Sequence, residues 1–304
     1  MFFQTSKQTA AIGHQIVRDA LQELGPRGLA ENDFSLTLLV HDRNGEVVPQ
    51  GFAHRGDVMF YPCSIIKIFY LVAAQAALEA GQIEGTLELD RAMHDMIKWS
   101  SNTATNYLID VVSDTTGETD LYAEHMCAWR ERRYGINTYF ESLGLPELAG
   151  INVSQKLMDD DRYGREKAFV QFGGNNHNRL TSNAAASMLA RIMTGKMVSP
   201  ARSKVMADLL QRPRTPEFLQ TPGAQVLNYL GQAMAEDATI WSKAGWTGWT
   251  RDPQASYRRH DVIHVDSSGA APFTLAVFTQ GQKISTDMSM LPYIGARAAS
   301  LLAR

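Results

Sequence analysis

The spacing of apolar residues predicts a helix near the start of the chain, over residues 8–24. The apolar positions recur every three or four residues, which places them on one face of a helix. Gly25-Pro26 then ends the pattern, because neither residue continues a helix well. The positions concerned are Ile12, Ile16, Val17, Ala20, Leu21 and Leu24.

A change of pattern after this helix predicts strands. Residues 34–41 form a continuous β-prone run, Asp42-Arg43-Asn44-Gly45 is a turn signal, and Val47-Val48 follows as a second short strand. We therefore expect a β-hairpin here. A third short strand is predicted at Val58-Met59-Phe60, just before Pro62.

The middle of the chain is predicted to be mainly helical. Residues 64–80 form a mostly apolar helix that Gly81 stops, and residues 87–210 alternate helical segments with polar loops. Within that stretch, residues 183–194 have helical periodicity, with Thr181-Ser182-Asn183 as the N-terminal cap and Gly195 as the stop.

Strands return at the end of the chain, at residues 238–242, 261–265 and 273–278, and residues 293–302 form a closing helix. Both ends therefore supply strands and an outer helix, whereas the centre supplies helices. We expect an α/β (α+β) fold with a sheet lobe built from residues 1–61 and 216–304. An all-α lobe, residues 62–215, is inserted between them. The cleft between the two lobes is the expected ligand site.

Composition narrows the function classes. With 304 residues, 44% of them hydrophobic, the chain can bury a large core, as a soluble globular protein does. The formal charge of -3 gives no reason to expect a nucleic-acid or anionic-membrane partner. The basic run from Arg130 to Arg133 is interpreted as a solvated helix face.

Cysteine and histidine usage argues against metals and disulfide frameworks. Cys63 and Cys127 are too few for either a multi-disulfide scaffold or a four-cysteine metal site, and we expect Cys63 to pack as a small buried hydrophobe. The eight histidines lack metal-ligand spacing, so no metal or other cofactor is expected.

The N-terminus lacks the features of a secretory signal, and no apolar run is long enough to span a membrane. These features predict either a cytoplasmic protein or the mature form of a periplasmic or secreted one.

A serine followed three residues later by a lysine, Ser64 and Lys67, begins the apolar helix. Residues three apart share a helix face, so the amine can activate the hydroxyl for nucleophilic attack. The alternative interpretation makes Ser64 a helix N-cap and Lys67 a solvated side chain in the first turn.

Two later motifs also offer polar groups for catalysis. Ser100 and Asn102 stand where one helix ends and another begins, and there they can relay a proton and hold a substrate amide. Helix capping by Ser101 or Asn102 is the competing interpretation. Lys243-Ala244-Gly245 follows a predicted strand, and the next backbone N–H, of Trp246, suits an oxyanion. A charged edge strand beside a glycine bend explains this last motif equally well.

Taken together and in this order, the three motifs resemble the Ser-x-x-Lys, Ser-x-Asn and Lys-x-Gly signatures of class A β-lactamases and penicillin-binding proteins. The resemblance covers most of the chain and implies an antiparallel sheet with the inserted α-lobe. The segments that match the family are Tyr61 to Lys67, Met96-Ile97, Asn102 to Asn106, Ile136 to Leu145 and Thr181-Ser182-Asn183.

The resemblance implies catalytic roles for five side chains. Ser64 is the residue that becomes acylated, and Lys67 is its base or proton relay. Ser100 passes the proton to the leaving nitrogen, and Asn102 holds the acyl side chain. Lys243 supports the electrostatics around Ser100 and an anionic substrate group.

The same resemblance assigns the backbone around these side chains. The N–H groups of Ser64 and Trp246 would form the oxyanion hole, and Ala244, Gly245 and Trp246 would line the substrate. The aromatic rings of Trp246 and Trp249 could form a wall, although covering the core is their commoner use. No metal or organic cofactor is implied.

The chain departs from the family pattern in two motifs. Ser101 replaces an aspartate, and Ala244 replaces a threonine whose hydroxyl normally helps to bind a substrate carboxylate. Candidates for a compensating cation are Arg251, Arg258 and Arg259, although surface arginines are the commoner explanation.

A third departure concerns the residue that activates water to hydrolyse the acyl-enzyme. The family's Glu-x-x-x-Asn loop, which positions the hydrolytic water, has no counterpart between Gly144 and Thr181. The acids there are Glu147, Asp159, Asp160, Asp161 and Glu166, and Val170 stands where Glu166 would need an asparagine. None of them is assigned as the deacylation base.

The resulting hypothesis is a β-lactamase-like serine hydrolase that cleaves an amide or β-lactam through an acyl-Ser64 intermediate. One alternative is a penicillin-binding peptidase, amidase or esterase that acts on a non-lactam substrate. Another is a β-lactam sensor that acylates and deacylates slowly. The partner in each case is a small-molecule or peptide substrate.

Overall fold

The computed structural model describes residues 2–43, 47–117, 119–157, 161–221 and 223–303. A five-stranded sheet in the order β2-β1-β5-β4-β3 is the centre of the fold, and every neighbouring pair is antiparallel. The strands are β1 (Phe34–Val40), β2 (Gln50–His54), β3 (Thr239–Thr247), β4 (Arg258–Ser267) and β5 (Ala270–Gln280). The expected antiparallel sheet from both ends of the chain is confirmed.

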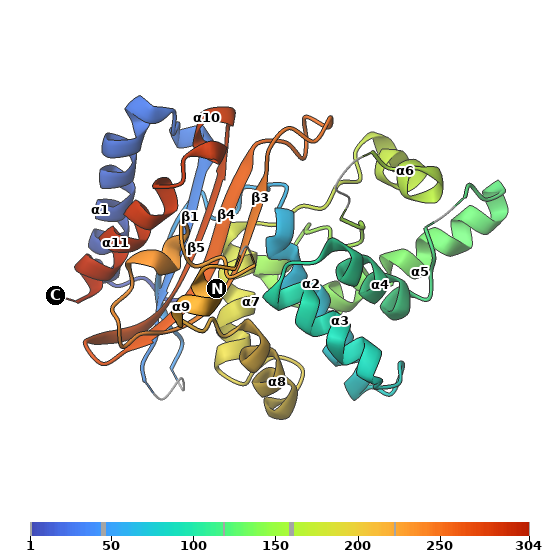
Figure 1. The fold of residues 1–304 in the computed structure, drawn as a ribbon, viewed down its shortest axis with the longest axis horizontal. Helices are drawn as coiled ribbons and strands as arrows, with labels where there is room; N and C mark the ends of the chain where they lie inside the picture. The colour runs from blue at the N-terminus through green and yellow to red at the C-terminus, as the bar shows by residue number, and fades with distance from the viewer. Residues whose placement is uncertain (1, 44–46, 118, 158–160, 222, 304) are drawn as a thin grey trace.

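Helices cover both faces of this sheet. On one face lie α1 (Lys7–Leu24) and α11 (Met290–Leu302), side by side, with the short α10 (Gln282–Thr286) at the end of β5. On the other face α7 (Ser182–Met193) packs against β1, β4 and β5 (Figure 1). The apolar stripe of α1 that the sequence predicts, including Ile16, Ala20 and Leu24, is buried against the sheet.

Of the remaining helices, all but the short α9 lie beyond α7, on the side of β3 (Figure 1). They come from the middle of the chain, as predicted, and are α2 (Lys67–Glu79), α3 (Leu87–Lys98), α4 (Asn102–Ser113), α5 (Ala123–Ser142), α6 (Gly164–Gln171), α8 (Pro200–Leu210) and α9 (Pro216–Leu219). Because α2 is apolar on every side, it is surrounded by the others and forms the centre of their core.

Two sequence-based strand predictions are wrong. Val47 and Val48 are exposed and precede the strand, which begins at Gln50, because the residues that face the core are Gly51 and Phe52. Residues 44–46 of the predicted turn lie outside the described residues. Of the predicted strand at residues 58–60, only Phe60 pairs, in an isolated bridge with Leu180.

Candidate active site

Ser64 lies in a single turn of 3-10 helix, Cys63–Ile66, which leads directly into α2. Cys63 has a left-handed backbone with φ 48°, an unfavourable conformation for a residue with a side chain. Ile66, not Ser64, is the N-cap of α2, so the capping interpretation of Ser64 is wrong. Cys63 is buried, as predicted, and burial raises the pKa of its thiol to about 12, which argues against a cysteine nucleophile.

Ser100 occupies the junction between α3 and α4 in a left-handed conformation, with φ 56°. The next residue, Ser101, caps α4 by accepting a hydrogen bond of 3.1 Å from the backbone N–H of Ala104. The capping interpretation is therefore right for Ser101. Since Ser101 satisfies the helix end, the Ser100 hydroxyl is left available for other partners.

Lys67 is fully buried, so its interpretation as a solvated side chain is wrong. Its Nζ donates to the Ser100 carbonyl oxygen at 2.6 Å and to the Asn102 Oδ1 at 2.8 Å. A third contact, of 3.1 Å, joins Nζ to the Ser100 hydroxyl. The first two motifs of the sequence thus meet around one amine.

Lys243 approaches the same hydroxyl from β3. Its Nζ lies 3.0 Å from the Ser100 Oγ and donates to Gln225 Oε1 at 2.6 Å and to the Ala244 carbonyl at 2.8 Å. Burial, followed by the positive charges of Lys67 and Arg212, holds the pKa of Lys243 well below its usual range. The Ser100 hydroxyl therefore lies between two lysine amines, and one of them, Lys243, has a lowered pKa.

β3 runs along the edge of the sheet and passes closely over the start of the 3-10 turn. A Cβ atom on Gly245 would lie 2.7 Å from the Ser64 amide nitrogen and 2.8 Å from the Cys63 Cβ. Such a distance is below any real Cβ contact. Gly245 is thus required by the close approach of the 3-10 turn to β3, and not by a bend in an otherwise free edge.

The outer edge of β3 presents backbone groups toward the helical side. The carbonyl of Ile240 accepts from the Arg212 N–H, that of Ser242 from the Arg212 guanidinium, and that of Ala244 from Lys243. Backbone groups of an antiparallel strand alternate sides with a period of two residues. The N–H of Trp246 therefore faces this same edge, beside the amide of Ser64.

Three polar residues that the sequence analysis missed surround Lys243. Gln225 accepts from the amine, and Arg212 joins β3 to the end of α3 through the carbonyls of Ser242 and Ile97. Asp261 is paired with Ala244 across the strands and is fully buried, and this burial raises its pKa to about 7. No spacing in the sequence signals Gln225 or Arg212, whereas a charged residue within the apolar run 261–265 was a visible sign for Asp261.

The loop before α7 is bound to α4 at Leu157. One turn after Asn102, the Asn106 amide donates to the Leu157 carbonyl at 2.8 Å and accepts from the Leu157 N–H at 2.9 Å. Leu157, which Asn106 of α4 binds here, has an apolar side chain, and this side chain cannot accept a proton from a water molecule. This geometry agrees with the missing Glu-x-x-x-Asn pattern.

The described acids of this loop already have ionic partners. Glu147 pairs with Arg191 at 3.1 Å, and Asp161 pairs with Arg251 at 3.2 Å. Glu166 is buried and pairs with Arg133 at 2.9 Å. Asp159 and Asp160 lie outside the described residues.

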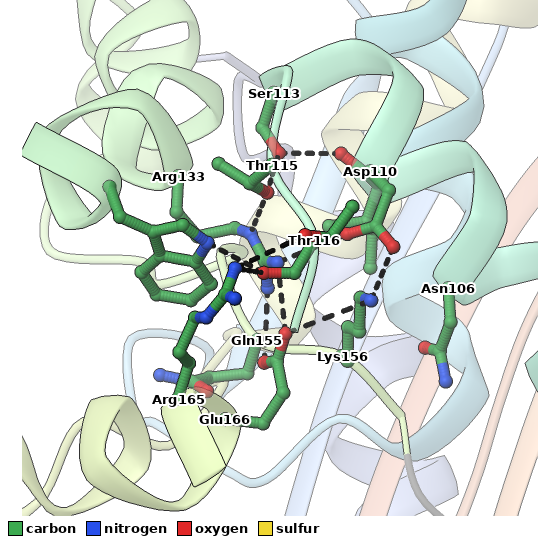
Figure 2. Close-up of polar contacts among 12 residues, drawn as sticks. Asn106, Asp110, Ser113, Thr115, Thr116, Arg133, Gln155, Lys156, Arg165 and Glu166 are labelled. Atoms are coloured by element: carbon green, nitrogen blue, oxygen red, sulfur yellow. Dashed lines mark hydrogen bonds and ion pairs between the residues drawn. The ribbon is translucent and has the colours of Figure 1, made fainter. Parts of the chain in front are cut away.

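Glu166 belongs to a buried charge cluster behind the loop (Figure 2). The Arg133 guanidinium lies between Glu166 and Asp110, and Lys156 donates to Asp110 at 2.5 Å from the other side. The prediction that the basic run at residues 130–133 is a solvated face is therefore wrong for Arg133, which is fully buried on α5. Helical periodicity explains the difference, since Trp129, Arg133 and Ile136 share one inward face.

The three arginines considered as substrate cations lie in different places. Arg251 is exposed and pairs with Asp161, and Arg258 lines a cavity with Phe60 and Tyr61. Arg259 lines a separate cavity together with Gln225, the partner of Lys243. Of the three arginines, Arg259 is thus the one that shares a cavity with a hydrogen-bond partner of Lys243.

Neither a metal centre nor a membrane helix is found within the residues that the structure describes. No group of three or more His, Cys, Asp or Glu side chains there could hold a metal ion. No helix in the same part of the chain is long and apolar enough to cross a membrane.

Solved structures of similar fold are β-lactamases and a penicillin-binding protein. A β-lactamase from Sphaerobacter thermophilus has 20% identity and a TM-score of 0.63, with 93% of this chain and 95% of that chain covered. A β-lactamase from Xanthomonas campestris has 16% identity and a TM-score of 0.65, covering 95% and 98%. PBP-A has 16% identity and a TM-score of 0.60, covering 94% and 95%.

By sequence, no curated protein matches the chain. The family model of the β-lactamase enzyme family matches residues 17–300, which is nearly the whole length. The chain belongs to the β-lactamase enzyme family.

Proposed function

We propose that the protein is a serine hydrolase that cleaves an amide or β-lactam through an acyl-Ser64 intermediate. The observation that carries the proposal is the hydrogen-bonded chain of Lys67, Ser100 and Lys243, which adjoins Ser64 through the 3-10 turn and Gly245. A structural role alone does not explain two lysine amines buried against one hydroxyl, because burying an amine is costly unless the site uses it.

In the proposed reaction the Ser64 oxygen attacks the substrate carbonyl, and its proton passes to Lys67. The oxyanion that forms is proposed to be held by the N–H groups of Ser64 and Trp246, a role supported by the close approach of β3 to the Ser64 nitrogen at Gly245. The Ser100 hydroxyl gives a proton to the leaving nitrogen and is resupplied from the lysines. The bond between carbonyl carbon and nitrogen breaks, and the acyl group remains on Ser64.

Asn102 and the β3 edge are proposed to hold the substrate. The Asn102 carboxamide accepts from Lys67 through its oxygen, so its NH2 group can donate to an acyl side chain. Ala244, Gly245 and Trp246 offer a strand edge for the rest of the molecule. Ala244 contributes no hydroxyl, so the substrate carboxylate must find another donor.

Slow release of the acyl group is the second part of the proposal. It rests on Leu157, the loop residue whose backbone is bound by Asn106, one turn after Asn102 on α4, and on the ionic pairing of Glu147, Asp161 and Glu166. With no carboxylate assigned to activate water, hydrolysis of acyl-Ser64 becomes rate-limiting. A penicillin-binding peptidase or a β-lactam sensor fits this behaviour better than a fast β-lactamase.

A chromogenic cephalosporin tests both parts in one experiment. We expect a burst of about one equivalent of ring opening, followed by slow turnover, and an intact-mass adduct that persists after the burst. The Ser64→Ala variant should show neither burst nor adduct. Fast turnover without a persistent adduct would contradict slow release, and an adduct that survives in Ser64→Ala would overturn the nucleophile.

A further inference from the structure

A polar cavity of about 290 Å³ lies beside the segment that leads to Ser64. Phe60 and Tyr61, which come shortly before the 3-10 turn Cys63–Ile66, form one part of its wall. Among the described residues that line this cavity, none belongs to the side chains assigned to catalysis. The cavity is therefore separate from the groups of the proposed reaction.

Two arginines from different elements line this cavity. Arg258 is the first residue of β4, and Arg179 belongs to the loop before α7. The Arg179 guanidinium donates to the Gly150 carbonyl at 2.9 Å. That of Arg258 donates to the Gln254 carbonyl at 3.0 Å. In the parts of the chain that the structure describes, neither arginine forms an ion pair, so two cations share one cavity without a bound carboxylate.

Arg258 has more hydrogen-bond donors than partners. A guanidinium carries five N–H groups, and the bond to Gln254 uses one of them. The Arg258 Nε is buried and has no partner among the described residues. Burial also lowers the pKa of this guanidinium from its ordinary value. Buried donors without acceptors are costly, so an acceptor is expected in the adjoining space.

The acids near Arg258 bind other side chains. Asp33 and Asp252 act on Arg258 electrostatically. However, Asp33 accepts from the Gln280 amide at 2.8 Å, and Asp252 lies 2.5 Å from His177 Nε2. Gln280 and His177 are among the described residues that line the cavity, whereas neither acid is. The described lining is therefore cationic and neutral.

Carboxamides stand at the mouth of the cavity. Asn175 and Gln254 are exposed, as is Arg179, whereas Phe60 is buried. The Asn175 Oδ1 lies 2.6 Å from His177 Nδ1, so the NH2 group of Asn175 is left to donate elsewhere. The volume is near the lower end of the range for small-molecule sites, about 300 Å³. It leaves room for more than one tetrahedral anion.

We propose that this cavity binds a phosphate group, either as the free ion or as the ester of a small polar molecule. Arg179 and Arg258 contact the phosphate oxygens, and Asn175 and Gln254 bind hydroxyl groups of the ester at the mouth. Guanidinium groups suit this ligand because their planar forks match phosphate oxygens two at a time. The proposal is independent of the proposed function, since it uses none of the catalytic side chains.

Isothermal titration calorimetry at about pH 8, where a phosphate carries nearly two negative charges, provides the test. The probes are inorganic phosphate, glucose 6-phosphate and glucose, with potassium chloride at matched ionic strength as the blank. We expect phosphate to bind one-to-one with a Kd of about 1 mM or lower. Glucose and potassium chloride should give no binding heat. Tighter binding of glucose 6-phosphate than of phosphate identifies an ester site, and equal or weaker binding identifies a site for the free ion.

Substitution of either arginine should weaken phosphate binding. Arg258→Met and Arg179→Met should each raise Kd by about 10-fold or more, which is the loss of one charge-assisted contact. Arg258→Lys keeps the charge and should retain part of the affinity, which guards against misfolding of the first variant. Arg251→Met is the matched control, because Arg251 is exposed and pairs with Asp161, and it should bind phosphate as the wild type does.

The proposal has two ways to fail. It is overturned if neither inorganic phosphate nor glucose 6-phosphate binds the wild-type protein. It is also overturned if Arg258→Met and Arg179→Met bind phosphate as tightly as Arg251→Met does, because the anion would then lie elsewhere. Neither result bears on Ser64, since acylation by a cephalosporin is measured separately.

Discussion

The Ser100 hydroxyl contacts two lysines that differ in their hydrogen bonding and in their pKa. It has one proton and lies within about 3 Å of both Lys67 and Lys243. Lys67 spreads its hydrogen bonds over three oxygens, whereas Lys243 has a pKa well below the usual range, chiefly through burial. In the proposed mechanism a proton can therefore pass between Lys67, Ser100 and Lys243 to the leaving group. At each step the buried positive charge stays within hydrogen-bond distance of its partners.

Gly245 gives the first prediction at this scale. Gly245→Ala places a methyl group against the Ser64 amide and the Cys63 Cβ, so β3, with the proposed Trp246 donor, must move away from the Ser64 amide. Acylation of Ser64 should slow by about 100-fold or more, because oxyanion stabilisation depends on donors in fixed positions. The rate of adduct formation with a cephalosporin, followed by mass spectrometry, measures the effect.

Gly269→Ala is the matched control, since a Cβ there meets no atom within 4 Å and the residue lies in the turn between β4 and β5. Its acylation rate should equal that of the wild type. Equal rates for Gly245→Ala and the wild type would show that the close approach of β3 to Ser64 has no part in catalysis.

At the residue scale, the spacing of residues in the sequence predicted only contacts between residues that are close in the sequence. Ser64 and Lys67 are neighbours on one turn, so their proximity follows from the sequence. The partners of Lys243 do not, because Gln225 and Arg212 come from loops whose path depends on the whole fold. Arg133 was misplaced because a basic run gives no sign of which member turns inward.

Among the elements, the loop between α5 and α7 is attached most firmly. Asn106 of α4 holds its backbone at Leu157, and Lys156 and Glu166 bind it to Asp110 and Arg133. These contacts join the loop to the helix that begins with Asn102. The buried charges therefore anchor the loop to α4 and α5 (Figure 2).

Arg133→Met tests this support. The substitution leaves the Glu166 carboxylate buried with Lys156, 3.8 Å away, as its remaining ionic partner. The free energy of unfolding should fall by about 3–5 kcal/mol, because an uncompensated buried charge is expensive. Urea denaturation measures the change, and the double variant Arg133→Met, Glu166→Leu should recover most of it.

Arg202→Ala breaks a partly exposed pair with Glu79 and is the control for this experiment. Its cost should be much smaller than that of Arg133→Met, because solvent already screens such a pair. If both arginine substitutions cost the same, the buried cluster does not stabilise the loop as described.

The elements themselves were largely predictable. The helix at residues 8–24 and the strands at 261–265 and 273–278 have strong periodicity or continuous β-prone runs, and each is found within one to three residues of its expected start. The second strand was misplaced because Val47 and Val48 have the higher β-propensity. The strand instead includes Gly51 and Phe52, because Phe52 packs on α1 and Gly51 leaves room for Phe3.

For the whole molecule, buried titratable groups predict how stability depends on pH. Burial lowers the pKa of His41 to about 4 and those of His260 and His264 to about 3, from an ordinary value of 6.5. As the pH falls below 6.5, the unfolded chain binds protons at these three sites and the folded chain does not. The free energy of unfolding therefore falls in this range.

Asp261 opposes this trend. Its pKa is raised from 3.8 to about 7 by burial, so the folded chain binds a proton between those values and the unfolded chain does not. At these four sites the unfolded chain binds three protons and the folded chain one, so stability falls by roughly 3 kcal/mol per pH unit between about pH 6 and 4. Thermal unfolding should accordingly show a melting temperature that drops steeply below about pH 6.

Asp261→Asn removes the opposing group, so its melting temperature should fall more steeply in acid than that of the wild type. From pH 5 to 8 the variant should gain stability relative to the wild type, since it never carries the buried anion. Asp120→Asn, at an exposed site, should follow the wild-type curve. A melting temperature independent of pH between 7 and 4.5 would contradict the burial of the histidines.

The pairing of β1 with β5 also determines the order in which the molecule can be completed during synthesis. Leu36 pairs with Val277, a separation of 241 residues, so β1 emerges long before its inner neighbour exists. At roughly 5–20 residues per second, translation of that interval takes on the order of 10 to 50 seconds. Throughout that time Phe34, Leu36 and Leu38, which are fully buried in the finished fold, have no sheet to cover them. The first strand to be made is therefore the segment most exposed to aggregation or chaperone binding, and the fold closes only when the C-terminal strands reach it.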